Sequence, residues 1–276
     1  MFAGVVCVAF LLNACASDVP SAPERTLRVC ADPNNLPFSN EAREGFENRI
    51  AELVARSLGA RLEYVWWPQR RGFVRNTLRA GTCDVVIGVP TSFELAATTR
   101  PYYRSTYVFV TRAGDPIPTS FDDPLLKRVT VGAHLIGDDG ANTPPVHALS
   151  SRGIVSNVRG YSIYGDYRSP NPPAALIAAV ARGELDLAVA WGPLAGYFTQ
   201  REALALVLTP VSPEIDVPFL PFVFDIGMGV ERENVTLLEE LNTFIADHRD
   251  QIDAILADYN VPRADRRRRG AVTEVR

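Results

Sequence analysis

The chain has 276 residues, of which 47% are hydrophobic and 22% are charged, and its formal net charge is −4. This length and apolar content suit one large domain or two small lobes with a buried core, and they exclude a disordered or collagen-like chain. The negative charge argues against nucleic-acid binding, because contacts to phosphates require a surplus of basic residues.

The N-terminus, residues 1–16, is a short apolar stretch that ends in small residues. It is too short to span a bilayer and is typical of an export signal, so we expect a periplasmic protein without an integral membrane span. Leu12 to Cys15 resemble a bacterial lipobox, which would leave a lipid anchor on Cys15. Cleavage after Ala16 is the alternative and would release a soluble protein.

The first half of the chain alternates between predicted strands and helices. Strands are expected at 26–31, 61–67 and 83–89, with helices at 45–60 and 70–80 between them. In the first helix apolar residues recur at three- and four-residue spacing, and Gly59 marks its end. This βαβαβ order predicts a parallel sheet with right-handed crossovers.

The second half repeats this order. Strands are predicted at 128–134 and within 156–165, and a helix is predicted to begin at Thr143, which Pro144 follows. A further helix ends at Gly183 and a strand follows it. The pattern Gly-x-x-Asp therefore occurs at 81–84 and at 183–186, in matching places. Any turn from helix to strand favours glycine and aspartate, but the matched copies predict two similar α/β lobes.

Two extended segments, 105–116 and 221–230, are expected to cross between the lobes. Lobe 1 is then discontinuous, with residues 25–112 and 222–260, and residues 113–221 form lobe 2. Two α/β lobes joined by a two-segment hinge form an architecture that traps ligands. The basic run from Arg263 reads as a solvated tail, disordered over 261–276, in preference to a nucleic-acid or membrane arm.

Four cysteines are present, and Cys7 and Cys15 belong to the predicted signal. Cys30 and Cys83 remain as an even pair in an oxidising compartment. Each lies in an apolar run that reads as a buried strand. Neighbouring strands would permit a disulfide, and two buried free thiols are the alternative.

Several segments together resemble a known family. "GFENRIAELVARSLGA", "RAGTCDVVIG", "TRPYYRSTYVFV" and "LDLAVAWGPLAGYF" resemble, in order over roughly 27–260, the extracytoplasmic solute-binding proteins of type II topology. More narrowly, "CADPNNLPFSN", "YVWWPQRRGFVRNTL" and "CDVVIGVP" resemble the J-type binding proteins, MxaJ or XoxJ, encoded with quinoprotein methanol dehydrogenases. The calcium-type and lanthanide-type branches both fit, and XoxJ is the preferred match.

This resemblance implies an α/β fold of the periplasmic binding protein type II class. It also implies a non-enzymatic accessory role in activating or maturing the dehydrogenase. The implied partners are the quinoprotein methanol dehydrogenase and its cytochrome c. The pyrroloquinoline quinone and the metal belong to that enzyme, so no cofactor and no metal are expected here.

The chain departs from the amino-acid binders of this topology at two positions. Those proteins hold the ligand carboxylate with an arginine after the third strand and the ammonium with an aspartate after the fourth. Here the stretch 88–103 has no arginine near Phe93, Arg100 lies closer to the hinge, and Trp191 occupies the aspartate position. Because removing one partner of a desolvated charge pair costs about 2 to 5 kcal/mol, free amino acids are not expected as ligands. Trp191 is expected either in the cleft or in the lobe core.

Candidate cleft residues follow the carboxyl ends of the predicted strands, where open α/β sheets bind ligands. They are Asn34, Asn35, Leu36, Phe38, Trp67, Gln69, Arg70, Arg71, Pro90, Thr91, Ser92, Asp138, Asp139, Asn142, Thr143 and Trp191. For Arg70 and Arg71 a solvated helix start is the alternative to ligand contact. Asp138 and Asp139 fit contact with a cation or a basic partner, and charge complementarity at a helix N-terminus is the preferred explanation.

Catalytic residues are not expected. His134, His147 and His248 lack the spacing of a zinc site, and the nucleophile-elbow and phosphate-binding glycine motifs are absent from the sequence. Some proteins of this fold are dehydratases, which leaves an enzymatic alternative of low weight. The favoured hypothesis is capture of a dehydrogenase segment or a small aromatic solute in a cleft walled by Phe38, Trp67 and Trp191. The alternative is the substrate-binding subunit of an ABC importer for a small solute other than an amino acid.

Overall fold

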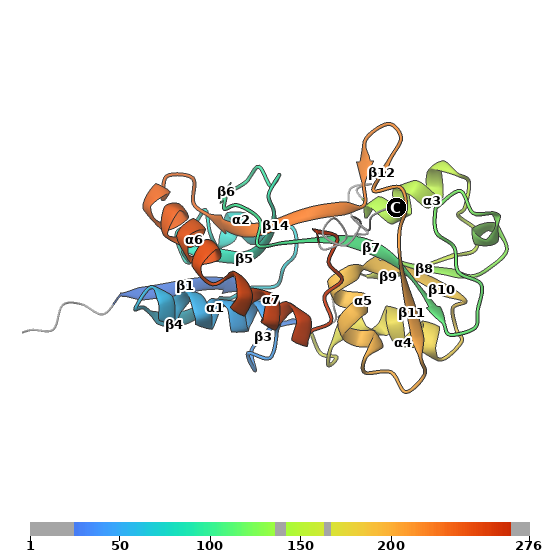
Figure 1. Cartoon of the computed structure of the whole chain (residues 1–276), viewed down its shortest axis with the longest axis horizontal. Helices are drawn as coiled ribbons and strands as arrows, with labels where there is room; N and C mark the ends of the chain where they lie inside the picture. The colour runs from blue at the N-terminus through green and yellow to red at the C-terminus, as the bar shows by residue number, and fades with distance from the viewer. Residues whose placement is uncertain (1–24, 136–141, 163–166, 266–276) are drawn as a thin grey trace, which may run out of the picture.

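The structure is a computed structural model that describes residues 25–135, 142–162 and 167–265. The predicted export signal, Asp138 and Asp139 lie outside these residues. The molecule consists of two lobes placed side by side along its longest axis (Figure 1). Figure 1 also shows α1 (Phe46–Ser57), α6 (Val235–Asp247) and α7 (Arg249–Asp258) around the sheet of the first lobe.

The remaining helices are short. They are α2 (Phe73–Asn76), α3 (Pro144–Ser151), α4 (Ala175–Ala181) and α5 (Gly192–Thr199), with 3-10 turns η1 (Pro124–Lys127) and η2 (Pro172–Ala174). The strands are β1 (Thr26–Ala31), β2 (Asn34–Asn35), β3 (Ser39–Asn40), β4 (Arg61–Trp66), β5 (Val85–Pro90), β6 (Ala97–Thr98), β7 (Tyr103–Arg112), β8 (Val131–Leu135), β9 (Val158–Ser162), β10 (Leu187–Trp191), β11 (Leu206–Pro210), β12 (Ile215–Asp216), β13 (Leu220–Pro221) and β14 (Val223–Val230).

The two lobes share one continuous sheet, in the order β4-β1-β5-β14-β7-β10-β8-β9. The pairs β1–β4 and β1–β5 in the first lobe and β8–β9 and β8–β10 in the second are parallel, as the alternation of elements predicted. β7 and β14 pair antiparallel at the centre and connect the lobes. The predicted fold class, two α/β lobes joined by a two-segment hinge, is therefore confirmed; the exact lobe limits stay a prediction.

The first predicted helix forms because its apolar stripe meets the sheet. Phe46, Ile50 and Val54 are fully buried on one face of α1. The helix begins where the Asn48 side chain accepts hydrogen bonds from the backbone N–H groups of Gly45 and Asn40. Gly59 follows its end with a positive φ of 60°, a conformation that favours glycine. The three- and four-residue spacing in the sequence was therefore a sound guide to this element.

The helix expected at 70–80 is much shorter than predicted. α2 has four residues, and turns replace the helix from there to Gly81. Gly72 and Gly81 both have positive φ and bracket the segment, while the buried Thr77 hydroxyl donates to the Phe73 carbonyl. Phe73 and Leu78 are buried against the sheet in this segment without a continuous helix.

The repeated Gly-x-x-Asp has the same structure in both lobes. Gly81 and Gly183 both have positive φ; Gly183 follows α4, whereas Gly81 ends the turns that follow α2. The Asp84 carboxylate then accepts a hydrogen bond from the Arg28 N–H at 2.8 Å, and the Asp186 carboxylate accepts one from the Thr130 N–H at 2.7 Å. In each lobe the aspartate therefore ties the incoming strand to the start of the neighbouring parallel strand. The motif thus has a structural role in both lobes, because it fixes the register of the strands.

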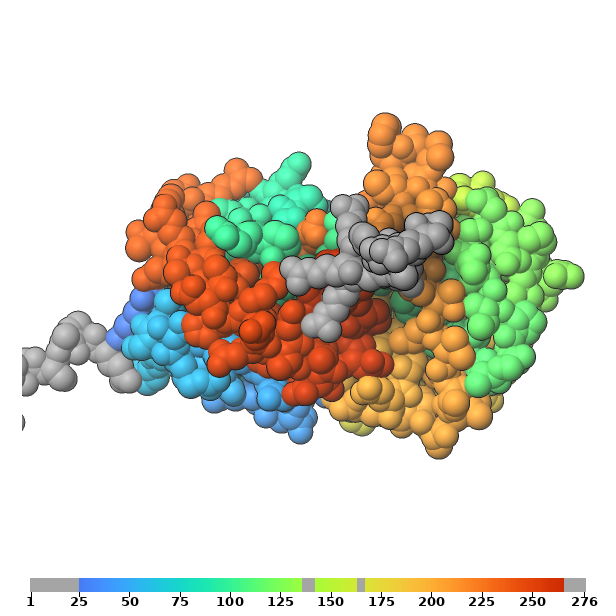
Figure 2. Space-filling view, in the orientation of Figure 1, coloured from blue at the N-terminus to red at the C-terminus, as the bar shows by residue number. Residues whose placement is uncertain are grey.

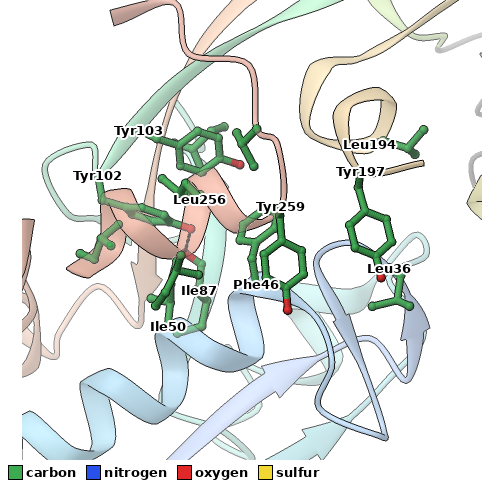
Figure 3. Packing of buried hydrophobic residues seen from close by; sticks show 14 of the residues in the cluster. Leu36, Phe46, Ile50, Ile87, Tyr102, Tyr103, Leu194, Tyr197, Leu256 and Tyr259 are labelled. Carbon is green, nitrogen blue, oxygen red and sulfur yellow. Dashed lines mark hydrogen bonds between the residues drawn. The ribbon is translucent and has the colours of Figure 1, made fainter. Parts of the chain in front are cut away.

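The C-terminal segment makes a further connection between the lobes. Beyond α7, the Tyr259 ring stacks on Tyr197 of α5 with centroids 5.5 Å apart, and Figure 3 shows the two residues next to each other. Arg263 is nearly buried and pairs with Asp253 and Asp265. Residues 261–265, expected to be part of a disordered tail, are therefore packed against the protein. Residues 266–276 lie outside the described part of the chain.

The described residues include no helix that is both long enough and apolar enough to cross a membrane.

Cys30 and Cys83 form a disulfide, with Cα atoms 5.5 Å apart. Both are buried in a small cluster with Phe73, Val74 and Leu78, on the face of the sheet that α2 covers. Cys30 lies in β1, and Cys83 lies just before the neighbouring strand β5. The sequence was compatible with a disulfide or with two free thiols, and the structure contains the disulfide.

Replacing both cysteines, Cys30→Ala with Cys83→Ala, should lower the free energy of unfolding by about 2 to 4 kcal/mol, because the cross-link restricts the unfolded chain. Urea denaturation followed by tryptophan fluorescence measures the change. Reduced wild-type protein should match the double variant. Equal midpoints for the oxidised wild type and the variant would contradict a stabilising role.

Candidate functional site

A cavity of about 400 Å³ lies between the two lobes. Its lining comes from both lobes and from the two connecting strands. The lining residues are Asn35, Phe38, Glu47, Gln69, Gly88, Pro90, Tyr103, Tyr107, His134, Thr143, Pro173, Trp191, Leu194, Phe224 and Ile226. Most of these side chains are apolar or aromatic, and the polar ones are few, which is the usual character of a ligand site.

The connecting strands form the floor of the cavity. Tyr103 and Tyr107 lie on one face of β7, because side chains four residues apart in a strand point the same way. Phe224 and Ile226 share a face of β14 for the same reason, and Ile226 is paired with Tyr103. The hinge strands and the floor of the cavity are thus made of the same residues.

Trp191 extends this aromatic floor. It ends β10 and is paired with Tyr107 of the antiparallel strand β7, so both side chains lie on one face. The Trp191 ring centroid is 5.3 Å from that of Tyr107 and 5.8 Å from that of Phe224, with edge-to-face geometry. The ring is half-buried. Trp191 therefore packs against the core and also lines the cavity, two positions that the sequence posed as alternatives.

The structure brings six of the predicted cleft residues to the cavity: Asn35, Phe38, Gln69, Pro90, Thr143 and Trp191. Eight others with described positions do not line it: Asn34, Leu36, Trp67, Arg70, Arg71, Thr91, Ser92 and Asn142. Asp138 and Asp139 lie outside the described residues. That these residues contact a ligand or partner stays a prediction.

The misplaced residues have identifiable positions. Trp67 follows β4, the edge strand of the sheet, and is 41% exposed. Leu36 is 4% exposed and packs in the main core. The expected aromatic wall of Phe38, Trp67 and Trp191 therefore needs correction, because the edge position of β4 takes Trp67 away from the cavity.

Some of the remaining predicted residues join the two lobes beside the cavity. The Asn34 side-chain amide donates to the Ser169 carbonyl at 2.9 Å, and the Arg70 guanidinium lies over the Tyr167 ring, 5.0 Å from its centroid. Ser169 and Tyr167 belong to the second lobe. These contacts hold the lobes together without lining the cavity.

Asp32 is the centre of this connection. Its carboxylate accepts hydrogen bonds from the N–H groups of Asn34 and Gln69, at 2.8 and 2.6 Å, and from the Tyr167 hydroxyl at 2.6 Å. Burial and this hydrogen bond to Asp32 raise the pKa of Tyr167. One buried carboxylate thus organises the loop after β1, the loop after β4 and the opposite lobe.

Glu47 is a lining residue that the sequence analysis missed. It lies in the first turn of α1, and its carboxylate reaches across to β5, where a methyl group at Gly88 would lie 2.0 Å from Oε1. Within the described chain, no residue donates a hydrogen bond to this carboxylate. Burial, with a smaller contribution from Asp32, raises the pKa of Glu47 to about 8.

The second lobe contributes His134 and Thr143. The Thr143 hydroxyl donates to the His134 carbonyl at 2.8 Å, which joins the end of β8 to the start of α3. Burial lowers the pKa of His134 to about 4, so its imidazole is neutral near pH 7. His134 therefore adds a polar group to the cavity but no positive charge.

The cavity lining carries no lysine or arginine among the described residues. Arg100 is exposed and its N–H donates to the Asn242 side chain, away from the lining. A ligand carboxylate would thus meet no cationic partner there. In the same described ranges, no three histidine, cysteine, aspartate or glutamate side chains gather as a metal site requires.

Comparison with known proteins assigns the family. Residues 27–261 match the family described as bacterial extracellular solute-binding proteins, family 3. The chain belongs to this family. The resemblance predicted from its segments is thereby confirmed.

Relatives within this group carry related names. Protein MoxJ of Methylorubrum extorquens is 33% identical over 90% of this chain and 84% of its own length, and protein MoxJ of Paracoccus denitrificans is 28% identical over 87% and 90%. Among solved structures, the periplasmic binding protein XoxJ from Methylobacterium extorquens AM1 is 35% identical, with a TM-score of 0.71, and covers 86% of this chain and 99% of its own. MxaJ from Methlophaga aminisulfidivorans MPT has a TM-score of 0.73 at 27% identity, covering 86% and 100%.

Glu47→Gln should change the pH dependence of stability. Because the Glu47 pKa is raised in the folded state to about 8, the native protein holds a proton that the unfolded chain releases near pH 4.5. The stability of the wild type should therefore fall relative to Glu47→Gln by about 1 kcal/mol per pH unit between these values, and the difference should level off above pH 8.

Urea unfolding at a series of pH values measures this difference. His134 and the other titrating groups are common to both proteins, so their contributions cancel in the comparison. A difference that stays constant with pH would contradict the buried position of the Glu47 carboxyl group.

Proposed function

We propose that the protein is a non-enzymatic periplasmic binding protein that assists the activation or maturation of a quinoprotein methanol dehydrogenase, preferably of the lanthanide type. It would do so by holding an exposed dehydrogenase segment in the cavity between its lobes. The observation that carries the proposal is an aromatic cavity without a lysine or arginine in its described lining. Such a lining suits apolar and aromatic side chains better than a zwitterionic nutrient.

The names of the relatives also support the proposed accessory role. MoxJ, MxaJ and XoxJ carry the names of the J-type proteins, whose resemblance to this chain implies a methanol dehydrogenase partner, and XoxJ is described as a periplasmic binding protein. Pyrroloquinoline quinone and its metal would remain with the dehydrogenase. A cytochrome c of the same system is a further proposed partner.

An exposed hairpin favours a protein partner over a solute alone. The turn between β12 and β13 presents Val217 and Phe219, which are 88% and 89% exposed. It stands out from the surface as the orange projection above the second lobe in Figure 2. Arg152 holds its base through two hydrogen bonds to the Asp216 carboxylate, at 2.6 and 2.9 Å. A fixed apolar tip of this kind is typical of a docking element.

The alternative proposal is an importer subunit that binds a small aromatic or other non-amino-acid solute and delivers it to a membrane permease. The cavity between the lobes and the hinge favour this alternative to the same degree as a captured segment. The two proposals differ in what stabilises the protein. A solute should raise the melting temperature by mass action, whereas the accessory role predicts stabilisation by the dehydrogenase.

Trp191→Ala should abolish the stabilisation by added dehydrogenase, because the variant removes the ring that joins Tyr107 and Phe224 in the cavity. Loss of a central aromatic contact typically costs 2 kcal/mol or more, about a 30-fold decrease in affinity. Thermal-shift and pull-down measurements with purified dehydrogenase test this expectation.

Trp67→Ala is the matched control, since it removes the same side chain outside the cavity. It should keep the affinity of the wild type. Equal capture of the dehydrogenase by Trp191→Ala and wild type would reject the cavity as the binding surface, and stabilisation by a solute alone would favour the importer.

A further inference from the structure

Glu47 introduces one acidic group into a mostly apolar cavity. Its carboxylate faces the space between the lobes, lies against the bare backbone of Gly88 and accepts no hydrogen bond from a described residue. The Glu47 side chain is half-buried, and a carboxyl group in a mostly apolar, partly enclosed space is most stable when it is paired. The missing partner is therefore expected on the ligand.

The alternative explanation is that Glu47 complements the positive end of α1. Acidic residues in a first turn often have that role. The side chain of Glu47, however, extends away from the helix to β5, and Asn48 already accepts the N–H of Gly45 at the helix start. Helix capping thus does not account for the direction of this carboxylate.

The charges around Glu47 define the kind of partner. Asp32 adds a second negative charge nearby, and the remaining titratable groups that face Glu47 are the hydroxyls of Tyr64, Tyr102 and Tyr103. His134 is neutral and the described lining has no lysine or arginine, so no cationic side chain of the lining pairs with Glu47. A cation on the ligand would gain from pairing with Glu47, and a ligand carboxylate would be repelled.

We propose that the cavity binds an organic ammonium group carried on an apolar stem, with Glu47 as the anion that pairs with the ammonium and with Trp191, Tyr107 and Phe224 as the surface for the stem. The inference rests on the proposed function, since it concerns the same cavity. An approaching cation favours the ionised form of Glu47, so binding offsets the effect of burial. Aromatic faces beside the carboxylate add attraction for a cation.

The ammonium has two sources, a free amine or the lysine side chain of a captured dehydrogenase segment. For the free amine, the probe is 2-phenylethylamine, titrated by calorimetry at about pH 8, where Glu47 is about half ionised. The comparison compounds are 2-phenylethanol, which lacks the charge, and phenylalanine, which adds a carboxylate. For the lysine, the probe is dehydrogenase with and without acetylation of its lysines, which removes their charge.

Glu47→Gln keeps the shape of the side chain and removes its charge. The variant should weaken the binding of 2-phenylethylamine, or of unmodified dehydrogenase, by about 30-fold or more, the loss expected when one partner of a buried charge pair is removed. Acetylation of the dehydrogenase should cause a similar loss with the wild type and none with the variant if lysine is the source. Glu41→Gln, an exposed residue outside the cavity lining, is the control and should bind like the wild type.

The inference is overturned if Glu47→Gln, folded as shown by its circular dichroism, binds both probes as tightly as the wild type. Binding of 2-phenylethanol or phenylalanine with the affinity of the amine also overturns it. These outcomes are separate from failure of the proposed function. Dehydrogenase capture that depends on Trp191 but not on Glu47 would leave the accessory role intact and reject the ammonium site alone.

Discussion

The pairing of β7 with β14 is the interaction on which the site depends. These two strands are the hinge segments between the lobes, and they pair directly, with Tyr103 opposite Ile226 and Thr106 opposite Val223. On the opposite face the Arg104 guanidinium bonds to the Asp225 carboxylate at 2.8 Å, which locks the same register. Because side chains alternate along a strand, this register decides which residues face the cavity. A slip by one residue would turn the aromatic floor away from the ligand.

Two contacts of different character join the lobes beside the cavity. On one side, Asp32 and Tyr167 form a buried hydrogen bond between the lobes. On the other, Tyr197 and Tyr259 stack, and Figure 3 shows them between the second lobe and the aromatic cluster around Phe46. The first contact is polar and readily exchanged for water, whereas the second buries apolar area. Opening is therefore expected to begin at Asp32 and to leave the C-terminal contact in place.

Much of the fold could be predicted from the sequence because its signals are local. The apolar spacing of α1 and the positive-φ positions at Gly59, Gly81 and Gly183 act within one or two turns of the chain. The matched Gly-x-x-Asp copies indicated two lobes correctly. The length predicted for α2 was wrong. The helix begins only after Gly72, which has a positive φ, and turns replace it after Asn76.

The site could be predicted only in part, because its position depends on contacts between distant segments. Trp191 was found since it follows the fourth strand. Tyr103 and Tyr107 were missed, although their alternation in "YYRSTYV" marks one face of a strand, because the segment was interpreted as a connection only. Glu47 was hidden by its place in a first helical turn, where acidic residues are common. No local signal distinguishes a capping carboxylate from one that faces a cavity.

The central claim is that the dehydrogenase binds in the space between the lobes. Hydrogen exchange of the full protein, measured with and without the purified quinoprotein dehydrogenase, tests it most directly. The account predicts slower exchange in β7 and β14 and around Trp191, which together form the cavity floor. Slower exchange confined to surfaces remote from the cavity, with these segments unchanged, would contradict it.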